Sequence, residues 1–317
     1  MSALRPFDLA HWTAHSPIRL EALRRALADP PLTLTPPALA ALFEVNRLRV
    51  VARRPADLQD YPELPVRVRG AVGRVLAALG PPIVNRHDPF ARPRAWDVLF
   101  EPMSAPASRA PIAKPLVVHA RVEAQSVLAS ASVFGLAGFW APDAGAALVG
   151  ALEGGVTLWE QGKTKASFPC LEAKSERQCG FDPPRLAVRE ARLRFRSPLR
   201  LRKGDSLATS EASFPIALAN RAARLAPWVG ARLAVDWGEV HRRARSIDVD
   251  YSDLRPYFWS RGTQRAHRRL PVLGLLGTLV MRGNLDFWTP FLQIAEAANA
   301  GAHASIGLGA FDLTLLP

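Results

Sequence analysis

Hydrophobic positions recur every three to four residues near the start of the chain, which predicts helices there. Apolar residues between Ile18 and Leu27 follow this spacing. A second helix is predicted over residues 35–45, where two prolines suit the first helical turn. Residues 1–41 are therefore predicted to form an N-terminal helical extension.

From residue 42 to residue 180 the pattern alternates between strands and helices. A polar, proline-bearing stretch over residues 174–185 marks the predicted end of this unit. Residues 85–111, rich in proline, arginine and small side chains, are predicted to be a connector. The predicted elements are a strand over 44–54, a helix over 65–79, two adjacent strands over 115–140, a helix opened by Pro142 and Asp143, and a strand over 163–173.

Residues 181–317 repeat the same order more clearly. The predicted elements are a strand over 186–205, helices over 213–230 and 236–247, strands over 248–262 and 271–284, an amphipathic helix over 286–300 with Asp286 at its start, and a closing strand over 304–316. The order β-α-β-β-α-β, twice, is that of tandem ferredoxin-like domains in the α+β class. One sheet face without helices is also the layout of the commonest RNA-binding module.

The charge changes this picture by indicating a partner. The chain of 317 residues has 41 Lys+Arg against 28 Asp+Glu, a formal net charge of +13. Most of the excess is arginine, and it indicates a polyanion, either nucleic acid or an anionic membrane. The sequence has no apolar run near the ~20 residues of a membrane span and no signal-peptide core at its start, so we predict a cytoplasmic protein without a membrane partner.

Arginines gather in three places, which predict contacts with the RNA backbone. In the strand over residues 186–205, Arg194 and Arg196 alternate with Leu193 and Phe195, so that one face is basic and the other apolar. The other two clusters are runs that contain no acidic residue: Arg242, Arg243 and Arg245 beside His241, and Arg261, Arg265, Arg268 and Arg269 beside His267. An ordinary solvated surface is the alternative interpretation.

A glycine-rich segment lies before the last predicted strand. Gly301, Gly307 and Gly309 would let a ligand backbone approach closely, and the exposed amides of such a loop can meet phosphate oxygens. A simple turn between helix and strand is the alternative, but one turn needs one glycine and not three.

The histidines are the candidate proton carriers. RNA cleavage by its own 2′-hydroxyl needs a base, an acid for the leaving 5′-oxygen and a cation near the phosphorane. His267 lies in an arginine run, His303 lies in the glycine-rich segment, and Arg265 or Arg269 is a candidate for the cation. The remaining histidines are His87 in a loop, His119 in a strand where a structural role is favoured, His241 in an arginine run, and His11 and His15 in the extension.

Several known kinds of site are absent from the sequence. There is no GxxxxGK[ST] loop, no HExxH, no GxSxG and no carboxylate cluster for two metals. The two cysteines, Cys170 and Cys179, exclude a disulfide framework and a four-cysteine zinc site, and are predicted to be free thiols. The predicted chemistry therefore uses neither a metal nor a cofactor.

Residues 270–313, LPVLGLLGTLVMRGNLDFWTPFLQIAEAANAGAHASIGLGAFDL, resemble a known family. They are similar to the C-terminal region of the CRISPR-associated endoribonucleases of the RAMP superfamily, which process precursor CRISPR RNA. Those proteins have a strand of the form PLxGLxGxLxLxG, then a helix, then a loop ending in GLGxYxL. Weaker resemblances to the same family cover YFWSRGTQRAHRRLP, FRSPLRLRKGD, LPVRVRGAVGRVL and AWDVLFEP, so that the likeness runs from about residue 42 to the end.

The resemblance implies two ferredoxin-like domains that recognise an RNA repeat hairpin. It further implies metal-free cleavage at the base of the stem, which leaves a 2′,3′-cyclic phosphate. The protein would then stay bound to its RNA product as a subunit of a CRISPR effector complex. The chain departs from the family in its glycine-rich loop, where relatives often have HVGKxT. Asn299 replaces that histidine and Ala302 that lysine, and Gly162 is all that remains of a loop in the first half.

Three functions follow as hypotheses. The leading one is an endoribonuclease that binds CRISPR repeat RNA and cleaves the precursor once per repeat. The second is a non-catalytic subunit that binds CRISPR RNA in an effector complex with other subunits. The third is a general basic protein that binds RNA or a membrane surface.

Overall fold

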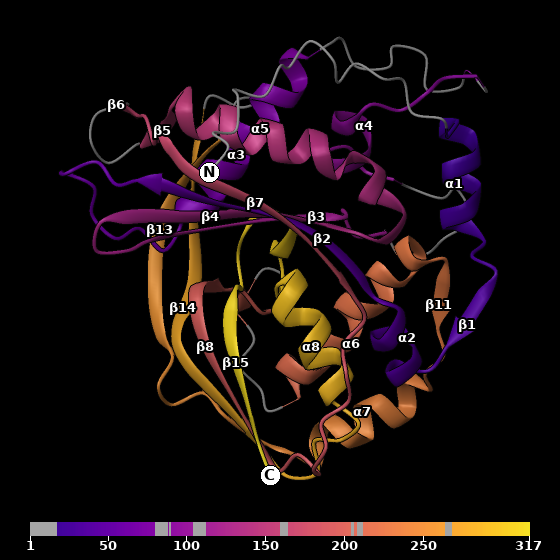
Figure 1. Ribbon diagram of the computed structural model, residues 1–317. Coiled ribbons are helices and arrows are strands. Elements are labelled where there is room, and N and C mark those ends of the chain that lie inside the picture. Colours follow the sequence, from indigo (N-terminus) through magenta and orange to yellow (C-terminus); the bar gives the residue numbers. More distant parts are fainter. Residues whose placement is uncertain are drawn as a thin grey trace.

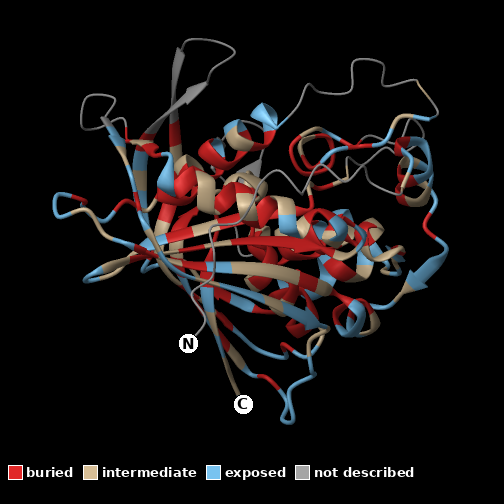
Figure 2. Cartoon of the chain, turned by 45° about the horizontal axis from the view of Figure 1, so that its top comes forward, coloured by how far each residue is buried: buried red, intermediate tan, exposed pale blue. Residues whose placement is uncertain are grey.

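The computed structural model describes residues 18–79, 88, 90–103, 112–158, 164–203, 206–207, 212–263 and 268–317. Two antiparallel sheets form its framework, each with helices on one face (Figure 1). The predicted α+β class is confirmed. The buried residues concentrate where the helices meet the sheets (Figure 2), and the largest of them include Trp140, Trp228 and Trp288.

The first sheet has the strand order β3-β4-β2-β7. Helices α3 and α5 cover the face on which Leu48 of β2 lies against Gly145 of α5. Arg47 and Arg49 alternate with Leu48 and so belong to the other face, which carries no helix of this half. The elements are β2 (Glu44–Arg53), α3 (Leu64–Ala78), β3 (Leu116–Val122), β4 (Ser126–Phe134), α5 (Ala141–Glu153) and β7 (Cys170–Cys179).

The second sheet repeats this arrangement. Its order is β12-β14-β8-β15, with β13 also paired to β14. On β8 the predicted alternation is confirmed, because Leu193 and Phe195 are buried while Arg194 is exposed. The elements are β8 (Glu190–Leu199), α6 (Ser213–Leu225), α7 (Trp237–Arg245), β12 (Asp248–Asp250), β13 (Arg255–Thr263), β14 (Arg268–Arg282), α8 (Thr289–Ala298) and β15 (Phe311–Leu316).

Residues 18–41, the described part of the N-terminal extension, lie against the C-terminal half. Both predicted helices form, as α1 (Leu20–Ala28) and α2 (Pro36–Leu42), and α2 packs against α8. Between them, β1 (Leu32–Leu34) pairs in parallel with β11 (Ala231–Leu233). The extension is therefore not purely helical as predicted, because a three-residue strand is too short to give a periodic pattern.

Several predicted element bounds were wrong. The predicted connector contains a short helix, α4 (Ala95–Leu99). Strand β7 runs through residues 174–179, which were predicted as a polar break. It is an edge strand paired only with β2, so most of its side chains are exposed and can be polar. Helix α8 begins at Thr289 rather than at Asp286, whose carboxylate instead accepts a hydrogen bond from the Val188 amide.

The remaining short elements connect these units. They are β5 (Val156–Leu158), β6 (Thr164–Ala166), β9 (Arg202–Lys203), β10 (Ser206–Leu207) and the 3₁₀ turns η2 (Gly135–Trp140), η3 (Ala226–Val229) and η4 (Ala304–Ile306). The helical run Gly135–Glu153, which joins η2 to α5, is long and apolar enough to cross a membrane by length and composition alone. Here it packs against α3 and the first sheet, as a core helix does.

Candidate functional site

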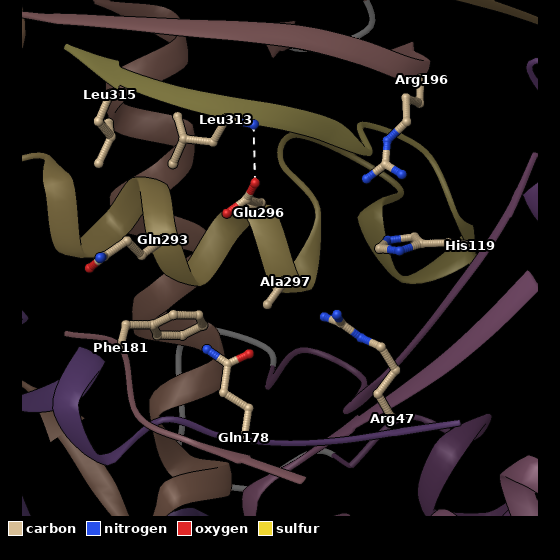
Figure 3. A pocket seen from close by; sticks show the side chains of 10 residues that line it. All are labelled: Arg47, His119, Gln178, Phe181, Arg196, Gln293, Glu296, Ala297, Leu313 and Leu315. Atoms are coloured by element: carbon tan, nitrogen blue, oxygen red, sulfur yellow. Dashed lines mark hydrogen bonds between the residues drawn. The ribbon is translucent and has the colours of Figure 1, made fainter. Parts of the chain in front are cut away.

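A pocket of about 550 Å³ lies between the two halves of the chain (Figure 3). The first sheet contributes Arg47 from β2, His119 from β3 and Gln178 from β7, and Phe181 follows β7. The second half contributes the rest of the lining: Arg196 from β8, Gln293, Glu296 and Ala297 from α8, and Leu313 and Leu315 from β15. The pocket therefore exists only when both halves are assembled.

His119 is held in one orientation by a hydrogen bond across the two halves. Its Nε2 lies 2.5 Å from Oδ1 of Asn299, the residue that follows α8. An amide oxygen only accepts hydrogen bonds, so Nε2 carries the proton and Nδ1 carries the lone pair. Nδ1 has no hydrogen-bond partner among the described residues.

The surroundings of His119 keep it neutral. Burial, and to a smaller extent the nearby guanidinium groups of Arg196 and Arg47, lower the pKa of His119 from 6.5 to about 4. The hydrogen bond with Asn299 opposes this shift. At pH 7 the imidazole is therefore uncharged and able to accept a proton at Nδ1.

Two arginines approach His119 from opposite sheets, and Figure 3 shows both side chains directed toward it. Arg47 Nε donates to Ser132 Oγ at 2.9 Å, and no carboxylate of a described residue forms an ion pair with Arg47. Arg196 Nε lies 3.3 Å from Asp312 Oδ1, although that contact lacks hydrogen-bond geometry. Burial lowers the pKa of both arginines. Partly buried positive charges without full compensation favour a bound anion.

Asn299 owes its position to an unusual backbone and to a buried arginine. Its φ of 62° and ψ of 157° are rare for a residue other than glycine, and its side chain is fully buried. Its Nδ2 donates to the carbonyl of Ala304 at 3.3 Å. Arg221 of α6 donates twice to the carbonyl of Ala298, at 2.8 and 3.1 Å, which fixes the end of α8. Backbone strain of this kind is typical of functional sites.

The three predicted loop glycines are each needed by the fold itself. All have positive φ values, from 69° to 98°. A Cβ atom on Gly307 would lie 2.7 Å from Cβ of Pro65, and one on Gly301 would lie 2.6 Å from the carbonyl oxygen of Arg200. The loop is thus packed closely between the two halves, and its contact with an RNA backbone stays a prediction.

We expect Gly309→Ala to lower the free energy of unfolding by about 2–4 kcal/mol. A Cβ there would lie 2.0 Å from the Ala300 carbonyl oxygen, at a φ of 69° that side chains rarely adopt. Gly70→Ala is the matched control, because a Cβ on Gly70 meets nothing within 4 Å. Gly70 lies inside α3, so the control should gain about 0.5–1 kcal/mol. Equal urea midpoints for both variants would contradict the packing described here.

The residues predicted from the sequence do not all lie at the pocket. His303 follows Asn299 by four residues, has a left-handed backbone (φ 63°) and precedes η4. Among the predicted arginines whose side chains the structure describes, Arg196 alone lines the pocket. The backbones of Arg261, Arg268 and Arg269 lie on the β13–β14 hairpin, and Arg265 and His267 lie outside the described residues.

The arginines of α7 have an acidic neighbour that the interpretation of their run overlooked. Glu239 precedes the run by one helical turn and forms ion pairs with Arg242 and Arg243, the latter at 2.5 Å. Arg243 also lies over the ring of Phe287, at 4.7 Å from its centre. Part of this charge is therefore compensated within the protein, whereas Arg245 remains exposed.

No group of three or more His, Cys, Asp or Glu side chains suitable for a metal ion occurs within the described parts of the chain. Cys170 and Cys179 are free thiols, as predicted.

Residues 193–311 match the model of the family "CRISPR-associated endoribonuclease Cas6". The resemblance predicted from the sequence is confirmed. The matched segment supplies Arg196 and Glu296 to the pocket and Asn299 as the partner of His119, whereas Arg47 and His119 come from the half that precedes it.

Solved structures extend the likeness to both halves. A Cas6 product complex has a TM-score of 0.51 and 19% identity over 86% of this chain and 100% of that chain. Thermus thermophilus Cas6 has a TM-score of 0.51 and 13% identity over 87% of this chain and 99% of its own. A second Cas6 product complex has a TM-score of 0.50 and 13% identity over 87% and 100%. At these identities the likeness concerns the fold, and no curated protein sequence matches the chain.

Proposed function

We propose that this chain is an endoribonuclease that binds CRISPR repeat RNA and cleaves the precursor transcript once per repeat. The observation that carries the proposal is a neutral His119, fixed through Asn299, with Arg47 and Arg196 on either side of it. The match of residues 193–311 to the Cas6 family and the similar fold of Cas6 product complexes support it.

The proposed reaction needs only groups of the protein and the RNA. His119 Nδ1 takes the proton of a 2′-hydroxyl, and the 2′-oxygen forms a bond to the adjacent phosphorus. The bond from phosphorus to the 5′-oxygen breaks, which leaves a 2′,3′-cyclic phosphate and a 5′-hydroxyl. His303 and His267 are the candidates for the acid that protonates the leaving oxygen.

The arginines act on the charge of the phosphorane. Arg47 and Arg196 are the described candidates for stabilising it, and Arg265 is a further one from the sequence. A phosphate between Arg47 and Arg196 also offsets the repulsion that lowers the pKa of His119. RNA binding therefore makes His119 a stronger base when the substrate is in place.

The proposed architecture is a pair of ferredoxin-like domains over residues 42–180 and 181–317. In support, both sheets have the order 2-3-1-4 when the strands of each are numbered along the chain, with β12 and β13 counted as one strand because both pair with β14. Every neighbouring pair is antiparallel. We further propose that the protein acts in the cytoplasm. After cleavage it stays bound to its RNA product and so becomes a subunit of a CRISPR effector complex.

Incubation with the cognate repeat RNA in EDTA tests this function. We expect a single cut and a product that ends in a 2′,3′-cyclic phosphate. An intact RNA, or cleavage that requires an added metal, would overturn the proposed mechanism.

The second candidate is a non-catalytic subunit that binds CRISPR RNA. Asn299, where relatives often carry a histidine, favours it. Tight binding of a repeat RNA that stays intact through long incubation would select this function over cleavage. Equal affinity for the repeat hairpin and a scrambled RNA would instead favour a general basic RNA-binding protein.

We expect the double variant Arg268→Ala, Arg269→Ala to weaken RNA binding and to flatten its salt dependence. Each lost phosphate contact should lower the slope of log K against log salt by about 0.7–0.9. Arg25→Ala is the matched control, since Arg25 is exposed on α1 beside Glu21. Fluorescence anisotropy at several salt concentrations measures both slopes, and an unchanged slope in the double variant would remove these residues from the interface.

A further inference from the structure

The proposed cleavage step uses only one end of the pocket. Figure 3 shows Arg47, His119 and Arg196 at that end, and Phe181 and Gln178 at the other. Gln293 and Glu296 share one face of α8 above them. An aromatic ring, two amides and a carboxyl are the groups with which proteins bind an unstacked nucleobase.

The ring of Phe181 is held in a fixed position at this end of the pocket. One side of its ring stacks on the buried Phe43, with ring centres 6.1 Å apart and an angle of 27° between the planes. Its own amide donates to the carbonyl of Ala40, which fixes the backbone of the segment. Phe181 is partly exposed and lines the pocket. The ring is thus held in place while part of it faces the cavity.

Both glutamines are anchored to the backbone around Phe181. Gln178 Nε2 donates to the carbonyl of Gly180 at 3.2 Å, and Gln293 Nε2 donates to that of Asp182 at 2.8 Å. Each amide therefore uses one of its N–H groups inside the protein and keeps its Oε1 as an acceptor. Gly180 has a φ of 78° and lies so close to Ala41 that a side chain there would clash. The two glutamine hydrogen bonds and the close packing of Gly180 on Ala41 therefore hold the segment that carries Phe181 in place.

Glu296 adds a further acceptor to this end. Its Oε1 accepts the Leu313 amide at 3.0 Å, and its other oxygen has no hydrogen-bond partner among the described residues. Together with Oε1 of Gln178 and of Gln293, this oxygen makes three free acceptors among the described groups at this end of the pocket, against one remaining N–H on each of the two amides. Adenine, cytosine and guanine each present an exocyclic amino group to such a wall, whereas uracil presents two carbonyls and one N–H.

We propose that this end of the pocket binds the base of the nucleotide on the 5′ side of the cleaved bond and favours bases with an exocyclic amino group. The base lies on Phe181, and Gln178, Gln293 and Glu296 accept from its amino group. Its 3′-phosphate lies between Arg47 and Arg196, where His119 meets its 2′-hydroxyl. The volume of about 550 Å³ is in the range of small-ligand pockets and suits one nucleotide. The choice of strand position rests on the proposed function, whereas the base site itself does not.

Nucleotide binding tests the base site without any cleavage. The probes are the 3′-monophosphates of adenosine, cytidine, guanosine and uridine, titrated to millimolar concentration into the intact protein and followed by NMR. We expect the uridine nucleotide to bind about five-fold or more weakly than the other three. Phe181→Ala should weaken all four about ten-fold, because stacking on an aromatic ring is largely independent of the base. Gln178→Leu should reduce the preference against uridine.

The controls separate the two ends of the pocket. Phe139→Ala, at an exposed ring outside the pocket, should leave all four affinities unchanged. Arg196→Gln should weaken the four nucleotides equally and keep their ranking. Equal affinity for all four bases, no binding at millimolar concentration, or a wild-type affinity in Phe181→Ala would each overturn the inference.

RNA cleavage supplies an independent readout. Replacing the base 5′ of the cleaved bond with uracil should slow the wild-type protein and leave Gln178→Leu less sensitive. If the repeat is never cleaved but the nucleotides bind as ranked, the base site stands and the proposed reaction fails. If the repeat is cleaved equally well with any base at that position, the reaction stands and the inference fails.

Discussion

His119→Ala is expected to lower the single-turnover rate of repeat cleavage by about 10²–10⁴-fold, the usual contribution of a general base. The side chain holds its lone pair on Nδ1 because Asn299 Oδ1 accepts from Nε2 at 2.5 Å. Removing it takes away the acceptor for the 2′-hydroxyl proton and leaves Arg47 and Arg196 in place. RNA affinity should therefore change little. Rapid-quench kinetics at saturating protein, with a binding titration beside it, measures the two effects separately.

Two further experiments distinguish this result from a purely structural effect. His241→Ala removes an exposed histidine on α7 and should keep the wild-type rate at saturating RNA. Added imidazole should restore part of the rate in His119→Ala, because it can occupy the vacated space and accept the proton. A wild-type rate in His119→Ala would move the chemistry to His303, His267 or Arg265.

The second large effect concerns stability in acid. His119 has a pKa of about 4 in the folded protein, against 6.5 as its ordinary value. Between those values the unfolded chain binds a proton that the folded chain does not, so stability falls as the pH falls. From pH 7 to pH 4 this linkage costs about 3 kcal/mol. His119→Gln removes it and should lose correspondingly less stability over the same interval.

The wild type must be compared with His119→Gln, because other groups change the stability in the opposite direction as the pH falls. Burial raises the pKa of Asp143 to about 6 and also raises that of Glu296. Both carboxyls favour the folded state as they take up protons in acid, so the wild-type curve alone mixes the effects. Urea unfolding of the wild type and His119→Gln at several pH values isolates the contribution of His119. Parallel curves would show that His119 titrates normally.

Local patterns predicted the elements but not the pocket. The alternation on β8 and the amphipathic α8 were visible because one short segment contains the whole signal. His119 was assigned a structural role, since alternation indicates only that a strand residue faces inward. That it faces Asn299, 180 positions later, follows from how the two halves pack. No spacing along the chain encodes that contact.

Two signals in the sequence could have been used further. Arg47 and Arg49 alternate with Leu48 and Val50 just as Arg194 and Arg196 alternate with apolar residues on β8. Reading both strands together would have indicated two sheets with basic faces. Glu239 lies three and four positions before Arg242 and Arg243, which is the helical spacing for ion pairs. Phe181 carried no such signal, because it stands in a segment that composition alone marks as a connector.

The pairing of β1 with β11 has a consequence for how the chain folds. Leu32 lies beside Ala231, 199 positions further along, and α2 packs against α8 near the other end. Contacts of such sequence separation are slow to form, because a long loop must close before they contribute. During synthesis β1 and α2 cannot dock until residue 231 and the later residues that they contact have been made. The early segment should therefore be the last to become protected from proteases, and its docking should complete the folding of the whole molecule.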